Sequence, residues 1–584
     1  MRASNCSRPN SSRNFARWLP ARRVDPGMIP VNRTEASDGL PAATDAAAPQ
    51  TFWPLQVIPG PWEPWPEAGI GRWVGFFLAL GLAARLIRYA LRFPLWEDEC
   101  FLSVNLIDRG YLDLLGPLDY YQVAPLLFLW AQRSMVALLG FNEYALRLVS
   151  LICAVASLGL FWWVARRLLT GLARVAAVAM FAVSYPPIRY AAEAKQYAGD
   201  LLVALVFAAL LVAWYQRRSS RWLWCLAALT PLAVGFSYPA VLVGAGASVF
   251  LATVLLADRS RRGWAAWIIL NLVLGASFAG LFGLSARHQT QRSLKVMQEC
   301  WKEGFPPLDS PARLLAWLVE AHTSDMLAYP VGGHHGGSTV TCVLCLVGVA
   351  ILARRRQGAL LLLLLGPLAW SFVAAAMHRY PYGQMAKFQI YMAPAICILS
   401  GVGIAGLFRL RYRGQPIPHV SAAVVLGVLA VFGAGSIVRD FVQPAKSATV
   451  MRARDFARWF WFTAEFESEA VCLKTDLGLD FSPATYNYGL SCLYLCNQKI
   501  YSPRHARGEP PRWDRISAQW PLRCVEYRGA RQPYDHQAAA AWLESMQKRY
   551  RLVSRERFPF VNIKRLDQSP SEFDYVEVYR FVPK

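Results

Sequence analysis

The chain has 584 residues, of which 55% are hydrophobic and only 17% are charged, and its formal net charge is +23. Globular domains usually carry about 25% charged residues, and disordered chains carry few apolar ones, so both classes are excluded. The positive charge alone would suit a nucleic-acid-binding protein. However, Lys and Arg stand in short clusters between long apolar runs, which is typical of a polytopic membrane protein and predicts no nucleic-acid partner.

Residues 1–69 are rich in Ser, Pro, Ala and Arg and contain no apolar core with a cleavage site. We therefore expect a disordered cytoplasmic tail rather than a signal peptide. A transmembrane helix needs roughly 20 mostly apolar residues, and runs of this kind follow the tail. They predict about 11 transmembrane helices, at 72–91, 145–165, 174–188, 198–215, 222–238, 239–257, 264–285, 338–353, 358–377, 389–408 and 419–438.

A further segment, 121–140, is long enough to cross a membrane but carries Gln132 and Arg133 near its middle. Cytoplasmic loops are enriched in Arg and Lys. If 121–140 lies along the surface, the arginine-rich tail and the basic connections share one side; these connections are Arg166–Arg174, Gln216–Arg221, Asp258–Arg262, Arg354–Arg356 and Arg409–Arg413. We therefore predict a surface helix at 121–140 in a multi-pass protein of the cell (inner) membrane, with a cytoplasmic amino terminus and an extracytoplasmic carboxyl terminus.

The polar region 441–584 alternates strand-like and helix-like stretches. Strands are expected at Ala470–Lys474, Arg551–Arg555 and Tyr575–Val582, and helices at 451–466 and 537–549. A region of this length buries its own core. The predicted organisation is a tail (1–69), a transmembrane catalytic domain (70–440) and an extracytoplasmic α/β domain (441–584).

Three acidic residues, Glu97, Asp98 and Glu99, stand in a row just after the first predicted span. One interpretation is a solvated helix start, in which Asp98 or Glu99 caps the run Phe101–Leu115. The other is catalytic: one carboxylate acts as general base while another holds a metal ion or a substrate hydroxyl.

A second charged cluster follows the third predicted span and contains Arg189, Glu193, Lys195 and Tyr197. In a helix, Arg189 and Glu193 are i,i+4 neighbours and can simply pair. That pairing leaves the cation of Lys195 and the phenol of Tyr197 for a ligand, and ionisable residues at such a place are functional candidates.

A third cluster, after the ninth predicted span, contains Arg379 and Lys387. The planar fork of Arg379 suits a phosphate, and Lys387 offers a compact charge. Each cation alone is equally explained by anchoring at the membrane interface. Three clusters on one face, acids in the first and cations in the others, favour an active site.

The motif Gly401-Val402-Gly403-Ile404-Ala405-Gly406 matches the dinucleotide-binding pattern letter for letter. It lies inside an apolar span with no strand before it. We therefore expect small residues that pack helices closely, and no nucleotide site.

Several motifs occur in a fixed order: Pro94-Leu95-Trp96 before Asp98-Glu99, the surface helix, Phe141–Leu148, Arg166–Leu168, Glu193–Ala198 and Arg379-Tyr380. This order resembles the GT-C glycosyltransferases that use polyprenyl-phosphate sugars. That family includes protein O-mannosyltransferases, aminoarabinose transferases of lipid A and Rgt-type galacturonosyltransferases. The resemblance covers about residues 70–440.

The resemblance implies a GT-C-like fold and an active site on the outer side of the membrane. Asp98 matches the catalytic acidic position and Glu99 its companion, while Glu193 matches an acid associated with acceptor or metal binding. Lys195 stands where relatives often have Arg, and Arg379 matches a residue near the lipid phosphate. The chain departs from the family pattern before the surface helix, where it has Gln122-Val123-Ala124-Pro125.

Transfer from a lipid phosphate needs a base for the acceptor hydroxyl and cations for the departing phosphate. Asp98 would be the base, and Lys195, Arg379 and Lys387 would bind the phosphate. A single displacement would invert the sugar, as it does in the family. The residues leave open whether a divalent metal ion bridges the carboxylates and the phosphate. The alternative function is a transporter or flippase of lipid-linked sugars that performs no chemistry.

Overall fold

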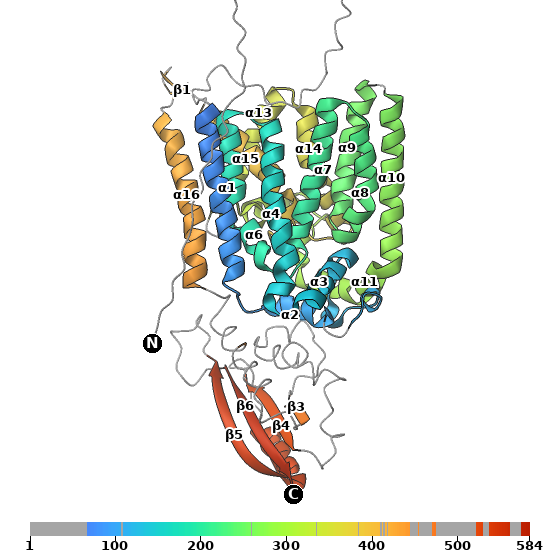
Figure 1. Ribbon diagram of the computed structural model, residues 1–584, viewed down its shortest axis with the longest axis vertical. Coiled ribbons are helices and arrows are strands. Elements are labelled where there is room, and N and C mark those ends of the chain that lie inside the picture. Colours follow the sequence, from blue (N-terminus) through green and yellow to red (C-terminus); the bar gives the residue numbers. More distant parts are fainter. Residues whose placement is uncertain are drawn as a thin grey trace, which may run out of the picture. The chain divides into compact units, whose positions relative to one another are not determined.

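The computed structural model describes residues 67–106, 109–258, 260–333, 336–383, 385–408, 411–412, 415–416, 419–443, 454, 470–474, 521–528, 536–560 and 574–584. All of them belong to the compact unit Phe52–Lys584. The described residues between Glu67 and Val442 form a bundle of helices (Figure 1).

The long helices of the bundle coincide with predicted spans: α1 (Glu67–Ala90), α4 (Glu143–Leu168), α7 (Tyr197–Arg217), α9 (Ala240–Asp258), α10 (Arg261–Leu281), α13 (Gly337–Arg354), α14 (Gly358–Ala376), α15 (Ala393–Leu407) and α16 (His419–Val442). Within the described residues, nine helices are long and apolar enough to cross a membrane. The predicted span at 222–238 is the shorter apolar helix α8 (Arg221–Phe236), which has 16 residues. The predicted polytopic α-helical membrane protein is confirmed.

The predicted span at 174–188 is not one helix. α5 (Gly171–Val183) ends at Ser184, and the short α6 (Tyr185–Arg189) continues at an angle of 45°. The cause is local, because Pro186 and Pro187 have no N–H to continue the ladder of α5. Arg85 of α1 compensates by donating a hydrogen bond to the carbonyl of Ala182, at 2.9 Å.

The segment 121–140 contains α3 (Leu126–Leu139), which does not run along the bundle. Its 14 residues extend about 21 Å, less than the roughly 30 Å of a hydrocarbon core. α3 lies at one end of the bundle, beside α2 (Glu97–Ser103) and α11 (Arg287–Cys300) (Figure 1). The buried side chain of Gln132 donates to the carbonyl of Leu146 at 2.9 Å, so its polar group is turned toward α4. The surface helix is confirmed, and the connections after α4, α7, α9 and α13 lie at the opposite end (Figure 1).

The described part of 441–584 contains a four-stranded sheet in the order β3-β4-β6-β5, formed by β3 (Ala470–Lys474), β4 (Leu522–Arg528), β5 (Tyr550–Phe560) and β6 (Asp574–Pro583). β3 and β4 are parallel, and the other pairs are antiparallel. α20 (His536–Arg549) contributes Met546 to a small core with Cys524 and Phe581. The expected mixture of strands and helix is confirmed here, while the helix expected at 451–466 lies outside the described residues except Arg454.

The three glycines of the dinucleotide-like motif lie within α15. A Cβ at Gly403 would lie 2.1 Å from the carbonyl oxygen of Leu344 in α13, and one at Gly401 would lie 2.7 Å from that of Ala173 in α5. These glycines therefore let the backbones of α13, α15 and α5 approach closely, as expected for small residues between membrane helices. The motif has no part in nucleotide binding.

We predict that Gly403→Ala destabilises the protein by about 1–3 kcal/mol, because α13 and α15 must separate to admit the methyl group. The matched control is Gly427→Ala in α16, where a Cβ meets nothing within 4 Å. That control should be neutral or stabilising, since Ala has the higher helix propensity. Thermal unfolding of both purified variants checks the prediction, and equal melting temperatures would contradict it.

Candidate active site

Glu99 is a buried anchor in the first turn of α2. Its side chain is 1% exposed and accepts two hydrogen bonds from Arg147, from Nε at 2.8 Å and from an Nη atom at 2.7 Å. The backbone N–H of Ala194 donates to Oε1 at 2.7 Å, and that of Trp96 donates to Oε2 at 3.2 Å. A carboxylate accepts about four hydrogen bonds, so Glu99 is saturated and is not available as a base.

Arg147, in the first turns of α4, is the centre of this anchor. Besides Glu99, its guanidinium donates to the carbonyls of Phe93 at 2.5 Å and Pro94 at 3.2 Å. A buried ion pair is stable only when further hydrogen bonds satisfy the remaining donors and acceptors, and here they do. The ion pair of Arg147 and Glu99 therefore connects α4 to the beginning of the outer loop and to the segment before α7.

Asp98, the preceding residue, has a different environment. Its Oδ2 lies 3.2 Å from Nζ of Lys387, and the two side chains are 13% and 9% exposed. Lys387 comes from the loop between α14 and α15, far away in sequence. Its ammonium group lies 4.4 Å from the ring centroid of Trp301, at the end of α11. The structure thus brings together the predicted base and one of the predicted phosphate ligands.

Lys195 lies close enough to Asp98 and Lys387 for their charges to affect it. It is buried and donates from Nζ to Oε1 of Gln122 at 2.6 Å. Burial lowers the pKa of Lys195 below its ordinary value of 10.5; Asp98 opposes the shift, and Lys387 adds to it. Gln122, which departs from the family pattern, is therefore the residue that orients this lysine.

Glu193 and Tyr197 lie in the wall of the site. Glu193 is buried and accepts a hydrogen bond from Nε of Arg189 at 2.6 Å, so the predicted i,i+4 pairing is confirmed. Its other oxygen, Oε2, is buried and has no hydrogen-bond partner among the described residues. Tyr197 is buried with its ring 4.9 Å from that of Tyr190, within the hydrophobic core.

Arg379 is not brought to this group. It is exposed, and its side chain has no ion pair or hydrogen bond with any residue that the structure describes. Sequence reasoning also missed the partners that hold the site, namely Arg147, Gln122 and Trp301. The first two lie in or beside motifs that the sequence singled out, but nothing in the sequence pointed to Trp301.

The acids do not fit a metal site. In the described part of the chain, no group of three or more His, Cys, Asp and Glu side chains is placed to hold an ion. Each acid of the site already faces a cation: Asp98 faces Lys387, Glu99 faces Arg147, and Glu193 faces Arg189. We therefore derive no step through a metal ion.

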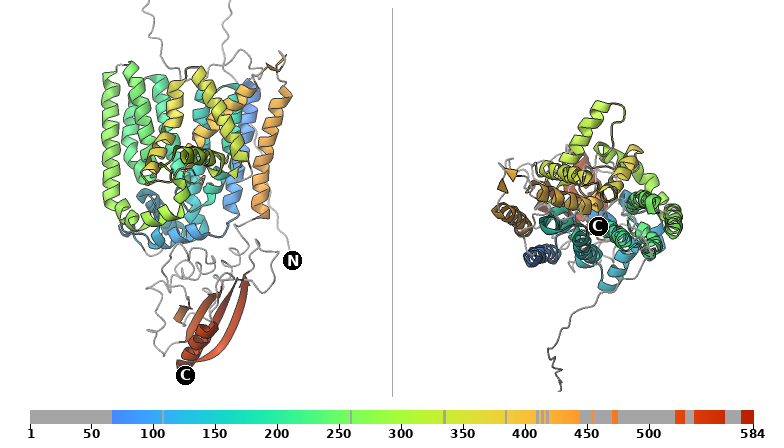
Figure 2. Two further views of the ribbon diagram at one scale, coloured as in Figure 1. Left: turned by 180° about the vertical axis from the view of Figure 1, so that it is seen from behind. Right: turned by 90° about the horizontal axis from the view of Figure 1, so that it is seen from above.

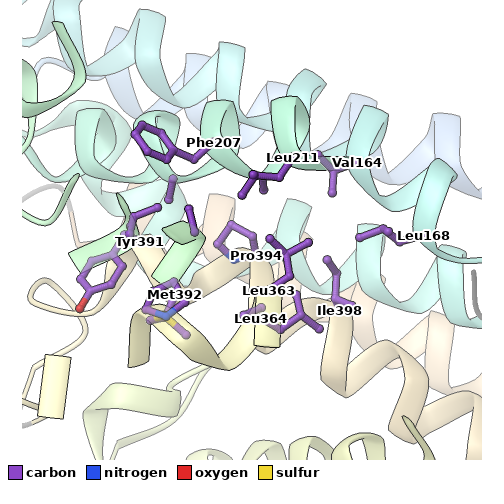
Figure 3. Close-up of a pocket in the computed structure, with 16 residues that line it drawn as sticks. Val164, Leu168, Phe207, Leu211, Leu363, Leu364, Tyr391, Met392, Pro394 and Ile398 are labelled. Carbon is purple, nitrogen blue, oxygen red and sulfur yellow. The ribbon is translucent and has the colours of Figure 1, made fainter. Parts of the chain in front are cut away.

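An apolar cavity of about 50 Å³ lies deeper in the bundle, between α4, α7, α9, α14 and α15 (Figure 3). Its lining includes Phe207, Leu211, Leu364, Pro394 and Ile398. A space of this size and polarity is too small for a sugar and stays dry. It is a packing gap and not part of the site.

One family model matches the chain: residues 123–281 match the family described as dolichyl-phosphate-mannose-protein mannosyltransferase. The match runs from just before α3 to the end of α10 and includes Glu193 and Lys195. It confirms the resemblance to GT-C glycosyltransferases in this part of the chain. No curated protein matches the chain.

Solved structures show a distant likeness. The crystal structure of ArnT from Cupriavidus metallidurans bound to undecaprenyl phosphate is 14% identical, with 87% of this chain and 98% of that chain covered and a TM-score of 0.48. The oligosaccharyltransferase of Archaeoglobus fulgidus tethered with an acceptor peptide is 11% identical, with 73% and 63% covered and a TM-score of 0.42. At these identities and TM-scores, neither likeness carries an argument about function.

We predict that Glu99→Gln destabilises the protein by about 3–5 kcal/mol, because it leaves the guanidinium of Arg147 buried without its counter-ion. The matched control is Asp309→Asn, which breaks the exposed ion pair of Asp309 and Arg313 and should cost about 0–1 kcal/mol. Thermal unfolding of the purified proteins measures both. If the two variants unfold alike, Glu99 is not the anchor of the site.

Proposed function

We propose that the protein is an integral-membrane inverting glycosyltransferase, which moves a sugar from a polyprenyl-phosphate carrier to a hydroxyl acceptor. The observation that carries the proposal is the cluster of Asp98, Lys387 and Lys195 at one end of the bundle. The carboxylate of Asp98 lies 3.2 Å from the ammonium group of Lys387, and it opposes the lowering of the pKa of Lys195. Asp98 can therefore act as the base for the acceptor hydroxyl, and the two lysines can bind the departing phosphate. The match of residues 123–281 to a family of membrane mannosyltransferases supports this class of reaction.

The reaction proceeds by a single displacement. The acceptor oxygen attacks the anomeric carbon of the sugar, and the bond from that carbon to the phosphate oxygen breaks. The acceptor proton passes to Asp98, and the bonding electrons leave with the polyprenyl phosphate. The carbon is attacked on the face opposite the leaving group, so its configuration inverts. Because a phosphate is a good leaving group, no general acid is required.

Lys387 and Lys195 have different roles toward the donor phosphate. Lys387 pairs with Asp98 in the free protein, and it bridges to the phosphate when the donor enters. Lys195, oriented by Gln122, stabilises the charge that develops on the departing phosphate. Arg379 is exposed, and its contact with the lipid phosphate stays part of this proposal.

The outer side of the cell (inner) membrane is the proposed location of the reaction. The basic connections lie at the end of the bundle opposite the Asp98 cluster, and an excess of Arg marks the cytoplasmic side. A transporter or flippase is the competing function. Transport sites usually lie near the middle of the membrane in broken helices, whereas Asp98 belongs to α2 at one end of the bundle.

We predict that Asp98→Asn lowers the transfer rate by about 10²–10⁴-fold, the usual contribution of a general base, while the protein still folds. The measurement is sugar transfer by purified protein from a panel of polyprenyl-phosphate sugars. The matched control is Asp119→Asn in the same outer loop, whose carboxylate pairs with Arg109 and is 49% exposed. That control should transfer at the wild-type rate.

The same assay separates the enzyme from a transporter. A flippase would move the lipid-linked sugar without forming a glycoside, in the wild type and in both variants. Wild-type turnover by Asp98→Asn would assign its carboxylate to helix capping and refute the mechanism.

We predict that donor binding weakens as the pH rises, and that this decline begins below pH 10.5, the ordinary pKa of lysine. Because the pKa of Lys195 is lowered, this residue loses its charge at a lower pH than an ordinary lysine does. Lys195→Arg should move this decline to higher pH, since a guanidinium stays protonated. The measurement is the KM for the donor as a function of pH. Lys302→Arg, at an exposed lysine, is the control and should leave the profile unchanged. Identical profiles for Lys195→Arg and the wild type would show that Lys195 does not contact the phosphate.

A further inference from the structure

A second cavity, of about 190 Å³, adjoins the Asp98 cluster. Its lining includes Glu99 and Arg147, Glu193 beside α6, and the last turns of α1 and α16. These two helices lie side by side at one edge of the bundle (Figures 1 and 2). Asp98, Lys195 and Lys387 do not line this cavity. The buried Glu99 anchor therefore stands between this cavity and Asp98, its neighbour in the chain.

The cavity lining carries one more positive than negative charge. Its acids are each paired: Glu99 with Arg147, Glu193 with Arg189, and Asp440 with Arg88. The fourth arginine of the lining, Arg439, has no ion pair with a described residue. Its guanidinium is exposed and lies 4.6 Å from the ring centroid of Tyr185.

Two buried polar atoms of lining residues have no hydrogen-bond partner among the described residues. One is Oε2 of Glu193, which can only accept, and the other is Nε of Arg88, which can only donate. Leaving such an atom buried and unpaired is costly, so each calls for a partner that the described residues do not supply. The two atoms require opposite kinds of partner, namely a donor such as a hydroxyl and an acceptor such as an anionic oxygen.

We propose that this cavity binds the acceptor through an anionic group and a neighbouring hydroxyl. The anionic oxygens lie toward Arg439 and Arg88, and the hydroxyl donates to Oε2 of Glu193. An apolar cavity of about 150 Å³ holds benzene, so this one has room for a phosphoglycerol group or one sugar ring. The acceptor class is thus a phosphorylated or carboxylated polyol, either a lipid headgroup or a soluble compound. This inference rests on the proposed function.

The test is direct binding to the full-length protein in phosphatidylcholine nanodiscs, measured by calorimetry. The probe is glycerol 3-phosphate, with glycerol and inorganic phosphate as comparisons. Wild type should bind glycerol 3-phosphate more tightly than phosphate and should not bind glycerol detectably. Arg439→Gln should weaken binding of glycerol 3-phosphate about ten-fold or more, because a charge-assisted contact is lost.

The matched control is Arg166→Gln at the opposite end of the bundle. Like Arg439, Arg166 is exposed and lies over an aromatic ring, 4.8 Å from the centroid of Trp162. Its replacement should leave binding unchanged. Glu193→Gln should abolish the advantage of glycerol 3-phosphate over phosphate, since Glu193 contacts the hydroxyl and not the anion. No binding by wild type, or equal binding by Arg439→Gln, would overturn the proposal.

Two further measurements identify the source of the ligand and separate this inference from the proposed function. If phosphatidylglycerol in the nanodiscs competes with the probe, the ligand is a lipid headgroup; if it does not, the ligand is soluble. Sugar transfer by wild type is assayed in parallel. Transfer without anion binding refutes only the acceptor subsite, whereas the absence of transfer from every polyprenyl-phosphate donor refutes the proposed function itself.

Discussion

The arrangement of the site depends on one buried ion pair, between Glu99 and Arg147. The two side chains are 1% and 3% exposed, so their charges have lost almost all contact with solvent. Removing both charges from water is costly, and the cost is offset here by hydrogen bonds to the backbone on both sides of the pair. Because those backbone groups belong to the outer loop and to the segment before α7, the pair fixes each segment relative to α4. Asp98 and Lys195 are next to the fixed residues in sequence, so their positions follow from it.

Adjacent carboxylates therefore have different roles. Successive residues on a helix point about 100° apart, so Asp98 and Glu99 face different surroundings. Glu99 is saturated by hydrogen bonds, whereas Asp98 faces a lysine and retains some exposure to solvent. On our proposals, Asp98 faces the donor, and Glu99 lines the cavity that binds the acceptor.

The sequence predicted the membrane bundle well because apolar length is a strong signal. The arginine-rich tail and connections also identified α3 correctly as a surface helix, since a crossing at 121–140 would have placed the tail and the connections on opposite sides. The break at Ser184 was missed, although Pro186 and Pro187 mark it, because the apolar run continues through them. The domain limits at 69 and 440 stay predictions.

For the site, the sequence predicted which residue types matter but not how they pair. Asp98, Lys195 and Lys387 do come together. Arg379 is exposed and has no hydrogen bond or ion pair with a described residue, so its role at the lipid phosphate stays a prediction. Glu99 was expected to assist in catalysis. Its saturation depends on Arg147 and Ala194, which come from two other segments. Local pattern cannot reveal such partners, because they are set by how distant helices pack.

The central claim is a single displacement at the anomeric carbon, with Asp98 as base. The most direct test determines the anomeric configuration of the product by NMR, using purified full-length protein and a polyprenyl-phosphate sugar of known configuration. Our account predicts a product of inverted configuration. A product of retained configuration would contradict it, because retention requires two successive displacements through a glycosyl–enzyme intermediate, and Asp98 would then be a nucleophile instead of a base.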